Sequence, residues 1–417
     1  MKQKKHLFVI GILLIAVFAF TLIFSSCSAE TEDGGVTTLY VYNWGEYISD
    51  GSEDSLDVNE AFEEWYYESF GEEVEVVYST FSSNEDMYAK LTAGAVSYDV
   101  IIPSDYMIER LIAEDWLLPL NYDNIPSADY IAPEFRGPDA KYDAYDKGGV
   151  YSVPYFYGMI GILYNTTMVD ENDSDIGSWS LMWDEDYRDN ILQFNNSRDA
   201  FGTAQYFLGI DVNTDDEAEW RRALEKLKEQ KDIVQGYVMD EIFNKMENGS
   251  AAIASYYAGD YLAMYENNED LEFFYPKEGT NLYVDAMCIP KCSRNKTAAE
   301  RYIEFMCTEE PAIANAEYTY YASPNTLVRE NPEYIEYMGE IKEDAYEKMY
   351  DTSSVTATSY VNLSGEKLAL INNLWEDLKS DIEVSPTIYV LCIAIVVTLA
   401  SFGIAFAIRK RIRQKYY

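Results

Sequence analysis

Apolar and polar positions near the start of the chain follow the order expected of a layered α/β domain. Strand-like stretches begin at Thr38, Val74 and Tyr98, and apolar residues at helical spacing follow each of them. The order β-α-β-α-β-α predicts a mainly parallel sheet with helices on both faces. In such a sheet, the loops after the carboxyl ends of the strands form the ligand crevice, so we expect the aromatic loop after the first strand to face it.

The apolar segment 152–165 is longer than an ordinary strand. We interpret it as two strands at the point where the chain passes from one lobe to another, with Gly158 and Gly161 allowing a bend. A second passage is expected at Tyr283–Pro290. Further helices are predicted near 180–187, 200–208, 217–229, 296–307 and 312–318.

The N-terminal end has the pattern of an export signal. A basic start precedes an apolar run and the small residues before Cys27, which predicts a signal peptide over residues 1–27. The end of this segment resembles a bacterial lipobox, so Cys27 is a candidate lipid-attachment residue. The alternative is a signal peptide or uncleaved anchor without a lipid.

A second apolar run, 388–408, contains no charged residue and is long enough to cross a hydrocarbon core of about 30 Å as a helix. The tail 409–417 is basic, so the positive-inside rule predicts that this tail is cytoplasmic. We therefore expect an extracytoplasmic domain that is anchored to the cytoplasmic membrane through a short stalk, 380–387, and a transmembrane helix.

Composition and charge exclude several kinds of chemistry. The single histidine, His6, lies in the predicted signal, which leaves no imidazole for a general base or a zinc ligand. The net charge is −42, and without the basic residues of both ends it is about −50, a charge that repels nucleic acid and attracts cations. The cysteines Cys288, Cys292 and Cys307 allow one disulfide, but the sequence does not select the pair.

Several short motifs occur in the order seen in bacterial polyamine-binding proteins. They are Tyr42–Tyr47, Tyr78–Thr80, Ser83–Glu85, Met87–Leu91, Pro103-Ser104, Pro276–Gly279 and Pro324-Asn325. Over Thr38–Asn325 the chain therefore resembles the spermidine/putrescine-binding subunits of ATP-driven importers. The resemblance implies a two-lobed, type II periplasmic-binding-protein-like fold that closes on its ligand by a hinge and delivers it to ABC permease subunits, without a cofactor or a metal.

The resemblance also implies how the lobes and the ligand site are built. The first lobe is expected at 38–157, completed by about 286–320, and the second at 158–285, completed by about 321–380. The expected ligand-binding residues are Trp44, Glu46, Tyr47, Ser104, Tyr106, Asp199, Tyr257, Asp260, Tyr283, Asp285 and Tyr321. Asp260 matches an acid of the putrescine-preferring branch, and Asn196 stands where spermidine-type members carry an acid. Both features favour putrescine or a related diamine.

The chemistry of a diamine is consistent with these residue types. Four methylenes between aromatic walls contribute about 3 kcal/mol, whereas micromolar binding needs about 8 kcal/mol net. Carboxylates must therefore supply much of the difference by pairing with the ammonium groups. The candidate carboxylates, in order of preference, are Asp285, Asp260, Asp199 and Glu46.

Other functions remain open at this point. A different small ligand, such as an amino acid, a sugar or an iron complex, is the main alternative within the binding class. An adhesin or sensor ectodomain is a further one. The chain has no phosphate-binding lysine loop, no Gly-x-Ser-x-Gly and no His-Glu-x-x-His, so we expect no enzyme. A glycosidase that uses two carboxylates is compatible with the composition.

Overall fold

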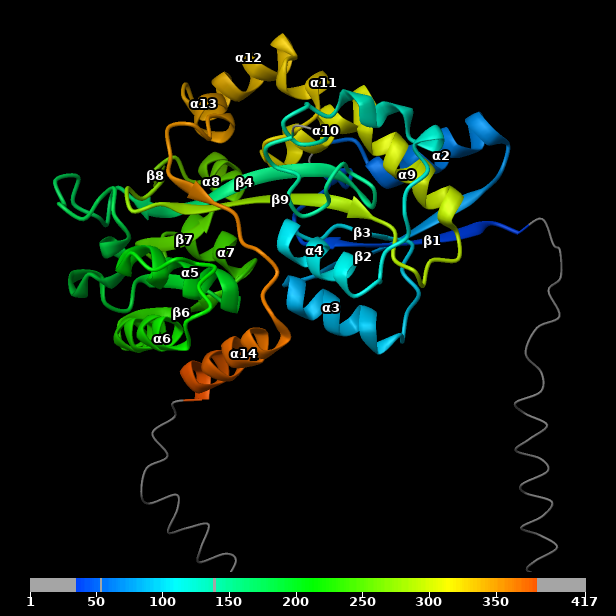
Figure 1. Ribbon diagram of the computed structural model, residues 1–417. Coiled ribbons are helices and arrows are strands. Elements are labelled where there is room, and N and C mark those ends of the chain that lie inside the picture. The colour runs from blue at the N-terminus through cyan, green and yellow to red at the C-terminus, as the bar shows by residue number, and fades with distance from the viewer. Residues whose placement is uncertain (1–34, 53–54, 138–139, 381–417) are drawn as a thin grey trace, which may run out of the picture.

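The computed structural model places two lobes side by side, with two long strands running between them (Figure 1). It describes residues 35–52, 55–137 and 140–380. The sheet order is β2-β1-β3-β9-β4-β7-β5-β6, and β8 and β10 pair with β4 and β9. The two-lobed α/β architecture expected from the sequence is therefore present.

The first lobe is built on parallel strands, as the alternating pattern predicts. β1 pairs in parallel with β2 and β3, and Leu39 and Val41 of β1 are completely buried. The N-cap of α3 is Ser83, whose hydroxyl accepts a hydrogen bond from the backbone N–H of Asp86. The elements are β1 (Thr37–Trp44), α2 (Val58–Phe70), β2 (Val74–Phe81), α3 (Asn84–Ala93), β3 (Val100–Ile101), α4 (Asp105–Ala113), η2 (Tyr122–Asn124) and η3 (Pro126–Tyr130).

The second lobe repeats this arrangement with β5 between β6 and β7, both parallel to it. The predicted helix at 180–187 is instead two short 3₁₀ helices, while the predicted helices at 200–208 and 217–229 are present with slightly wider bounds. The elements are η4 (Trp179–Trp183), η5 (Glu185–Tyr187), β5 (Ile191–Phe194), α5 (Ser197–Leu208), α6 (Glu217–Lys231), β6 (Val234–Val238), α7 (Glu241–Glu247), β7 (Ile253–Tyr257), α8 (Ala258–Asn267) and β8 (Leu271–Phe274).

The segment 152–165 is one continuous strand, so the expected pair of strands is wrong. β4 (Ser152–Asn165) pairs with β9 (Thr280–Cys288) in its first half and with β7 and β8 in its second half. Its glycines make room for aromatic rings. A Cβ on Gly158 would lie 2.5 Å from the hydroxyl of Tyr283, and one on Gly161 would lie 2.6 Å from the carbonyl oxygen of Phe274.

The C-terminal part of the described chain begins on the first lobe, passes over the two long strands and ends beside the second lobe (Figure 1). Its elements are α9 (Lys296–Cys307), α10 (Glu309–Thr319), α11 (Thr326–Arg329), α12 (Pro332–Ile341), α13 (Ala345–Tyr350), β10 (Ala357–Thr358) and α14 (Gly365–Ser380). We call residues 355–363 the C-terminal strap. It contacts both lobes, since Asn362 N–H donates to Glu109 Oε2 (2.7 Å) and Val361 N–H donates to Asn213 Oδ1 (3.0 Å).

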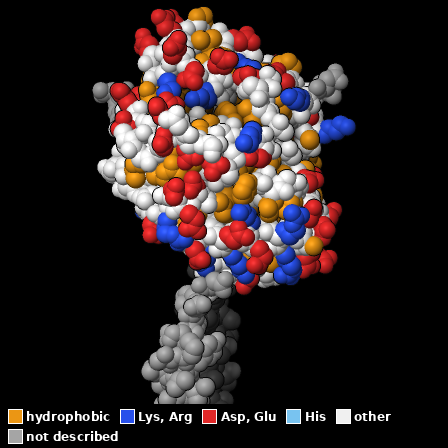
Figure 2. All heavy atoms as spheres, turned by 90° about the vertical axis from the view of Figure 1, so that its left-hand side faces the viewer, with side chains coloured by type: hydrophobic (Ala, Val, Ile, Leu, Met, Phe, Trp, Pro, Cys, Tyr) orange, Lys and Arg blue, Asp and Glu red, His pale blue; other side chains and the backbone are white. Residues whose placement is uncertain are grey.

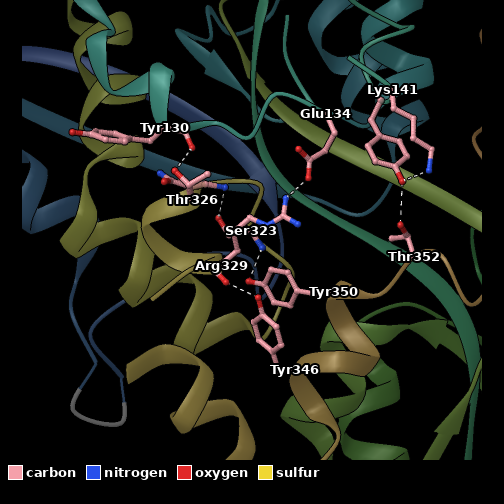
Figure 3. A network of polar contacts seen from close by, with 11 residues as sticks. Tyr130, Glu134, Lys141, Ser323, Thr326, Arg329, Tyr346, Tyr350 and Thr352 are labelled. Atoms are coloured by element: carbon pink, nitrogen blue, oxygen red, sulfur yellow. Dashed lines mark hydrogen bonds and ion pairs between the residues drawn. The ribbon is translucent and has the colours of Figure 1, made fainter. Parts of the chain in front are cut away.

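A polar network joins α11 and α13 to the loop before β4 (Figure 3). Arg329 forms an ion pair with Glu134 at 2.5 Å, and its carbonyl oxygen accepts a hydrogen bond from Tyr346. A second hydrogen bond, between the hydroxyls of Tyr142 and Thr352 (3.0 Å), joins the loop before β4 to the segment just after α13. These contacts fix the C-terminal helices against the loop that leads into β4. The lobe bounds expected from the sequence stay a prediction.

The expected fold class needs one correction. Across residues 35–52, 55–137 and 140–380, no helix combines the length and the apolar character needed to cross a membrane. The described part of the chain is therefore a two-lobed α/β fold, and the transmembrane helix that we added to the fold class is not part of it. The last described helix, α14, is amphipathic and buries Ile371 and Leu374 against the second lobe. The segment 388–408, the tail 409–417 and the signal 1–27 with Cys27 lie outside the described residues.

The three cysteines of the described chain are free. Cys288 and Cys307 are buried, and Cys292 is half-buried. The disulfide that the sequence allowed is therefore absent among these residues.

Candidate functional site

A cavity of about 60 Å³ lies between the lobes and collects ten of the eleven ligand-binding residues expected from the sequence. They are Trp44, Tyr47, Ser104, Tyr106, Asp199, Tyr257, Asp260, Tyr283, Asp285 and Tyr321. Trp44 ends β1, Asp199 follows β5, and Asp260 follows β7. The carboxyl ends of parallel strands from both lobes thus meet at one crevice.

Asp285 of β9 is a buried acid of the cavity lining. Its Oδ2 accepts a hydrogen bond from the Tyr47 hydroxyl at 2.7 Å, while its Oδ1 is buried without a partner. Burial raises the pKa of this carboxyl to about 6, although hydrogen bonds from Ser104 and Tyr47 lower it. A cationic group beside Oδ1 would fill the vacant acceptor and stabilise the ionised form.

Two further carboxylates come from the second lobe. Asp199 Oδ2 accepts from the Tyr257 hydroxyl (2.7 Å) and from Asn196 Nδ2 (2.6 Å). Burial raises the pKa of Asp199 to about 7, and the hydrogen bond from Tyr257 offsets part of the rise. Asp260 Oδ2 accepts from the Tyr321 hydroxyl at 2.8 Å, and burial holds its pKa well above the ordinary value.

Aromatic side chains form the walls between these acids. Tyr257 and Tyr283 meet edge to face at 5.5 Å, and Tyr47 meets Tyr321 in the same way at 4.6 Å. Trp44 Nε1 and the hydroxyl of Tyr283 are buried without a hydrogen-bond partner. Flat apolar walls with a few unsatisfied polar atoms are typical of a pocket for a small ligand.

Ser104 lies at the N-cap of α4, as predicted, but its hydroxyl makes no capping hydrogen bond. Instead it accepts from Asn84 Nδ2 at 3.0 Å and lies opposite Asp285 in an isolated bridge. The hydroxyl of Tyr106 donates to Glu85 at 3.0 Å. Contacts within the first lobe thus orient both residues toward the cavity.

The structure does not bring Glu46 into the lining of this cavity. Glu46 lines a neighbouring open groove of about 790 Å³, which shares Asp260 with the cavity. Its role in ligand binding stays a prediction.

Ten of the lining residues were not among the expected ligand-binding residues, and Asp240, Asn281 and Tyr360 are three of them. Asp240 follows β6, so its place at the carboxyl end of a parallel strand could have identified it. Tyr360 belongs to the C-terminal strap, where no sequence pattern points to the cavity. In the described chain, the one group of acids close enough to share a metal ion, Asp173, Asp175 and Asp184, lies outside the cavity lining.

Comparison with known proteins agrees with this architecture. The sequence pattern of the family described as "Bacterial extracellular solute-binding protein" matches residues 59–342. The chain belongs to this family. Its members are solute-binding receptors, and the family is not one of enzymes.

The similar proteins confirm the resemblance to polyamine-binding proteins. The spermidine/putrescine-binding periplasmic protein of Salmonella typhimurium is 28% identical over 88% of this chain and 97% of its own length. The putrescine/cadaverine-binding protein of Pseudomonas aeruginosa is 28% identical over 82% of this chain and 93% of its own length. The solved spermidine/putrescine ABC transporter substrate-binding protein of Streptococcus pneumoniae is 32% identical, with a TM-score of 0.63, over 82% of this chain and 98% of that one.

Proposed function

We propose that this protein captures a polyamine in the cavity between its lobes, preferring a diamine such as putrescine. The observation that carries the proposal is the cavity lining: three buried carboxylates stand among aromatic walls, and no Lys or Arg lines the cavity in the described chain. Such a site suits a ligand with cationic ends and an apolar middle. A ligand with a carboxylate end would have no cationic partner there.

The size of the cavity supports a short ligand. The cavity has a volume of about 60 Å³, which is small for a ligand site. Putrescine, with two nitrogens and four methylenes, is a short ligand that suits a small cavity. Spermidine is longer by four non-hydrogen atoms and would require the lobes to move further apart.

The transport role rests on the relatives, which are named as periplasmic binding proteins and as an ABC transporter substrate-binding protein. In our proposal the lobes close on the polyamine by a hinge at β4 and β9, and the closed form delivers it to the permease subunits of an ABC importer. The proposal includes export directed by residues 1–27, with a lipid on Cys27 as its finer form. The protein then acts by binding and catalyses no reaction.

Replacing Asp285 by Asn tests the proposed site. The variant Asp285→Asn keeps the shape of the side chain and removes the negative charge beside the vacant acceptor. We expect the dissociation constant for putrescine to rise more than tenfold, about 1.4 kcal/mol or more, as measured by calorimetry. Glu269→Gln removes one charge from the exposed surface of the second lobe and serves as the matched control. Equal affinities of Asp285→Asn and wild type would exclude Asp285 as the ammonium partner.

A further inference from the structure

The two lobes touch at the mouth of the cavity through a glycine and an acid. Gly45, in the loop after β1, and Asp240, just before α7, both line the cavity. A Cβ on Gly45 would lie only 2.5 Å from Asp240 Oδ2. The loop of the first lobe therefore lies directly against the carboxylate of the second lobe, and any side chain at position 45 would disturb this contact.

A second acid of the first lobe lies beside this contact. Glu46 follows Gly45 with a left-handed backbone (φ 48°), a conformation that few non-glycine residues adopt. Both Glu46 and Asp240 remain exposed at the mouth. Partial burial raises the pKa of the Glu46 carboxyl, and the negative charges of Asp240, Asp50 and Glu247 raise it further.

Among the described residues that line the cavity and the neighbouring groove, no lysine or arginine compensates the negative charges of Glu46 and Asp240. The neighbouring groove is lined by Glu46, Glu247, Asp260, Glu266, Glu310 and Glu317, and neither it nor the cavity has a Lys or Arg in its lining within the described chain. Asp260 lines both the cavity and the groove, so in addition to burial the negative charges of Asp240 and Glu46 raise the pKa of its carboxyl. Burial is the largest cause of its raised pKa, the hydrogen bond from Tyr321 lowers it, and the charges of Asp240 and Glu46 add to the rise.

We propose that Glu46 of the first lobe and Asp240 of the second lobe form an acidic gate that discriminates diamines from monoamines. Closing the lobes brings these two like charges together, which opposes closure. A diamine that pairs one ammonium with Asp285 brings its second ammonium to the gate end of the cavity and neutralises the repulsion. A monoamine fills the cavity but leaves the gate uncompensated. This inference rests on the proposed polyamine function and assigns Glu46 and Asp240 a role in selectivity.

The test compares putrescine with 1-aminobutane, which has the same four-carbon chain and one ammonium. Calorimetric dissociation constants are measured for wild type, Asp240→Asn, Glu46→Gln and the double variant, with Glu269→Gln as the control for net charge. We expect wild type to prefer putrescine at least 100-fold. Each single variant should bind 1-aminobutane at least threefold more tightly than wild type. The gain in the double variant should be smaller than the product of the single gains, because either substitution alone removes the pairwise repulsion.

Each outcome separates the gate from the proposed function. Wild type without a preference for putrescine would contradict the proposed function itself. A wild-type preference with unchanged binding of 1-aminobutane in the variants would overturn the gate alone. A large loss of putrescine affinity in Asp240→Asn, with 1-aminobutane unchanged, would overturn it too and make Asp240 a direct ligand contact.

A second measurement does not depend on the choice of ligand. Small-angle scattering of the ligand-free protein reports how far the lobes are open. We expect ligand-free Asp240→Asn to be more compact than ligand-free wild type, and putrescine to bring both to the same radius of gyration. Equal ligand-free radii for the two proteins would contradict the gate.

Discussion

Among the many acids of this chain, the hydrogen-bond partners of the buried ones separate structural from binding roles. Asp99 accepts from the backbone N–H groups of three residues and from a serine hydroxyl, and Asp146 accepts from two backbone N–H groups and a serine hydroxyl in another loop. These carboxylates hold loops together. Asp285, Asp199 and Asp260 instead accept from side chains, namely tyrosine hydroxyls, an amide and, for Asp285, the Ser104 hydroxyl, and they line the cavity. Their remaining acceptor capacity is available to a ligand.

The raised pKa of Asp285 predicts a particular pH dependence of stability. An unfolded Asp titrates near 3.9, whereas burial raises the pKa of Asp285 to about 6. Between these values the folded protein binds more protons than the unfolded chain, so this residue makes the ligand-free protein less stable as pH rises. Asp285→Asn should therefore gain stability relative to wild type between pH 5 and pH 8, as measured by urea unfolding.

The same ionisation has the opposite effect on ligand binding, because only ionised carboxylates pair with ammonium groups. Putrescine should bind wild type more tightly at pH 8 than at pH 5, and Asp285→Asn should retain a smaller increase that reflects Asp199. An affinity of wild type that is independent of pH over this range would contradict the assignment of these carboxylates.

At the level of elements, β4 shows where sequence patterns stop being sufficient. Almost every residue of this 14-residue strand is buried, so the alternation that marks a half-exposed strand is missing. The strand is long because β9 covers its first half and β7 and β8 cover its second. These partners come from distant parts of the sequence, and local patterns cannot identify them. From the sequence, Gly158 and Gly161 therefore suggested a bend. In the structure they instead leave room for the side chain of Tyr283 and for Phe273 and Phe274.

This reading of β4 predicts the effect of Gly161→Ala. The new Cβ would lie against the ring of Phe273 and 2.6 Å from the backbone oxygen of Phe274, which cannot move without disturbing β8. We expect the free energy of unfolding to fall by roughly 1–3 kcal/mol in urea denaturation. Gly236→Ala in β6 is the matched control, because nothing lies within 4 Å of its Cβ position. Equal stabilities of the two variants would contradict the tight packing around β4.

On the scale of the whole molecule, the order of strands and helices and most of the cavity could be predicted from the sequence. Trp44, Asp199 and Asp260 lie at or just after the ends of strands and line the cavity. The resemblance to a known family identifies these positions in the sequence. Asp240 and Tyr360 lie in segments outside those motifs, so the resemblance did not identify them: the end of β6 could have pointed to Asp240, but only the tertiary fold brings Tyr360 to the cavity. The fold class that we expected included a transmembrane helix, whereas no helix within residues 35–52, 55–137 and 140–380 could cross a membrane.

The charge of the whole molecule is a separate matter from the site. Acidic side chains are spread over the face of the second lobe shown in Figure 2, with basic side chains between them. A chain with a net charge of −42 attracts polycations loosely over its entire surface. Salt screens such exposed charges strongly but has less effect on buried pairs. Salt dependence therefore distinguishes surface attraction from binding in the cavity.

Whether the cavity between the lobes is a polyamine site is tested by calorimetric titration of the full chain with putrescine and then with spermidine, each at low and high salt. We predict one-to-one binding that persists at high salt, with putrescine bound more tightly than spermidine. Weak heat from several sites that high salt abolishes would contradict the proposed site, because it would show attraction to the acidic surface and no polyamine site between the lobes.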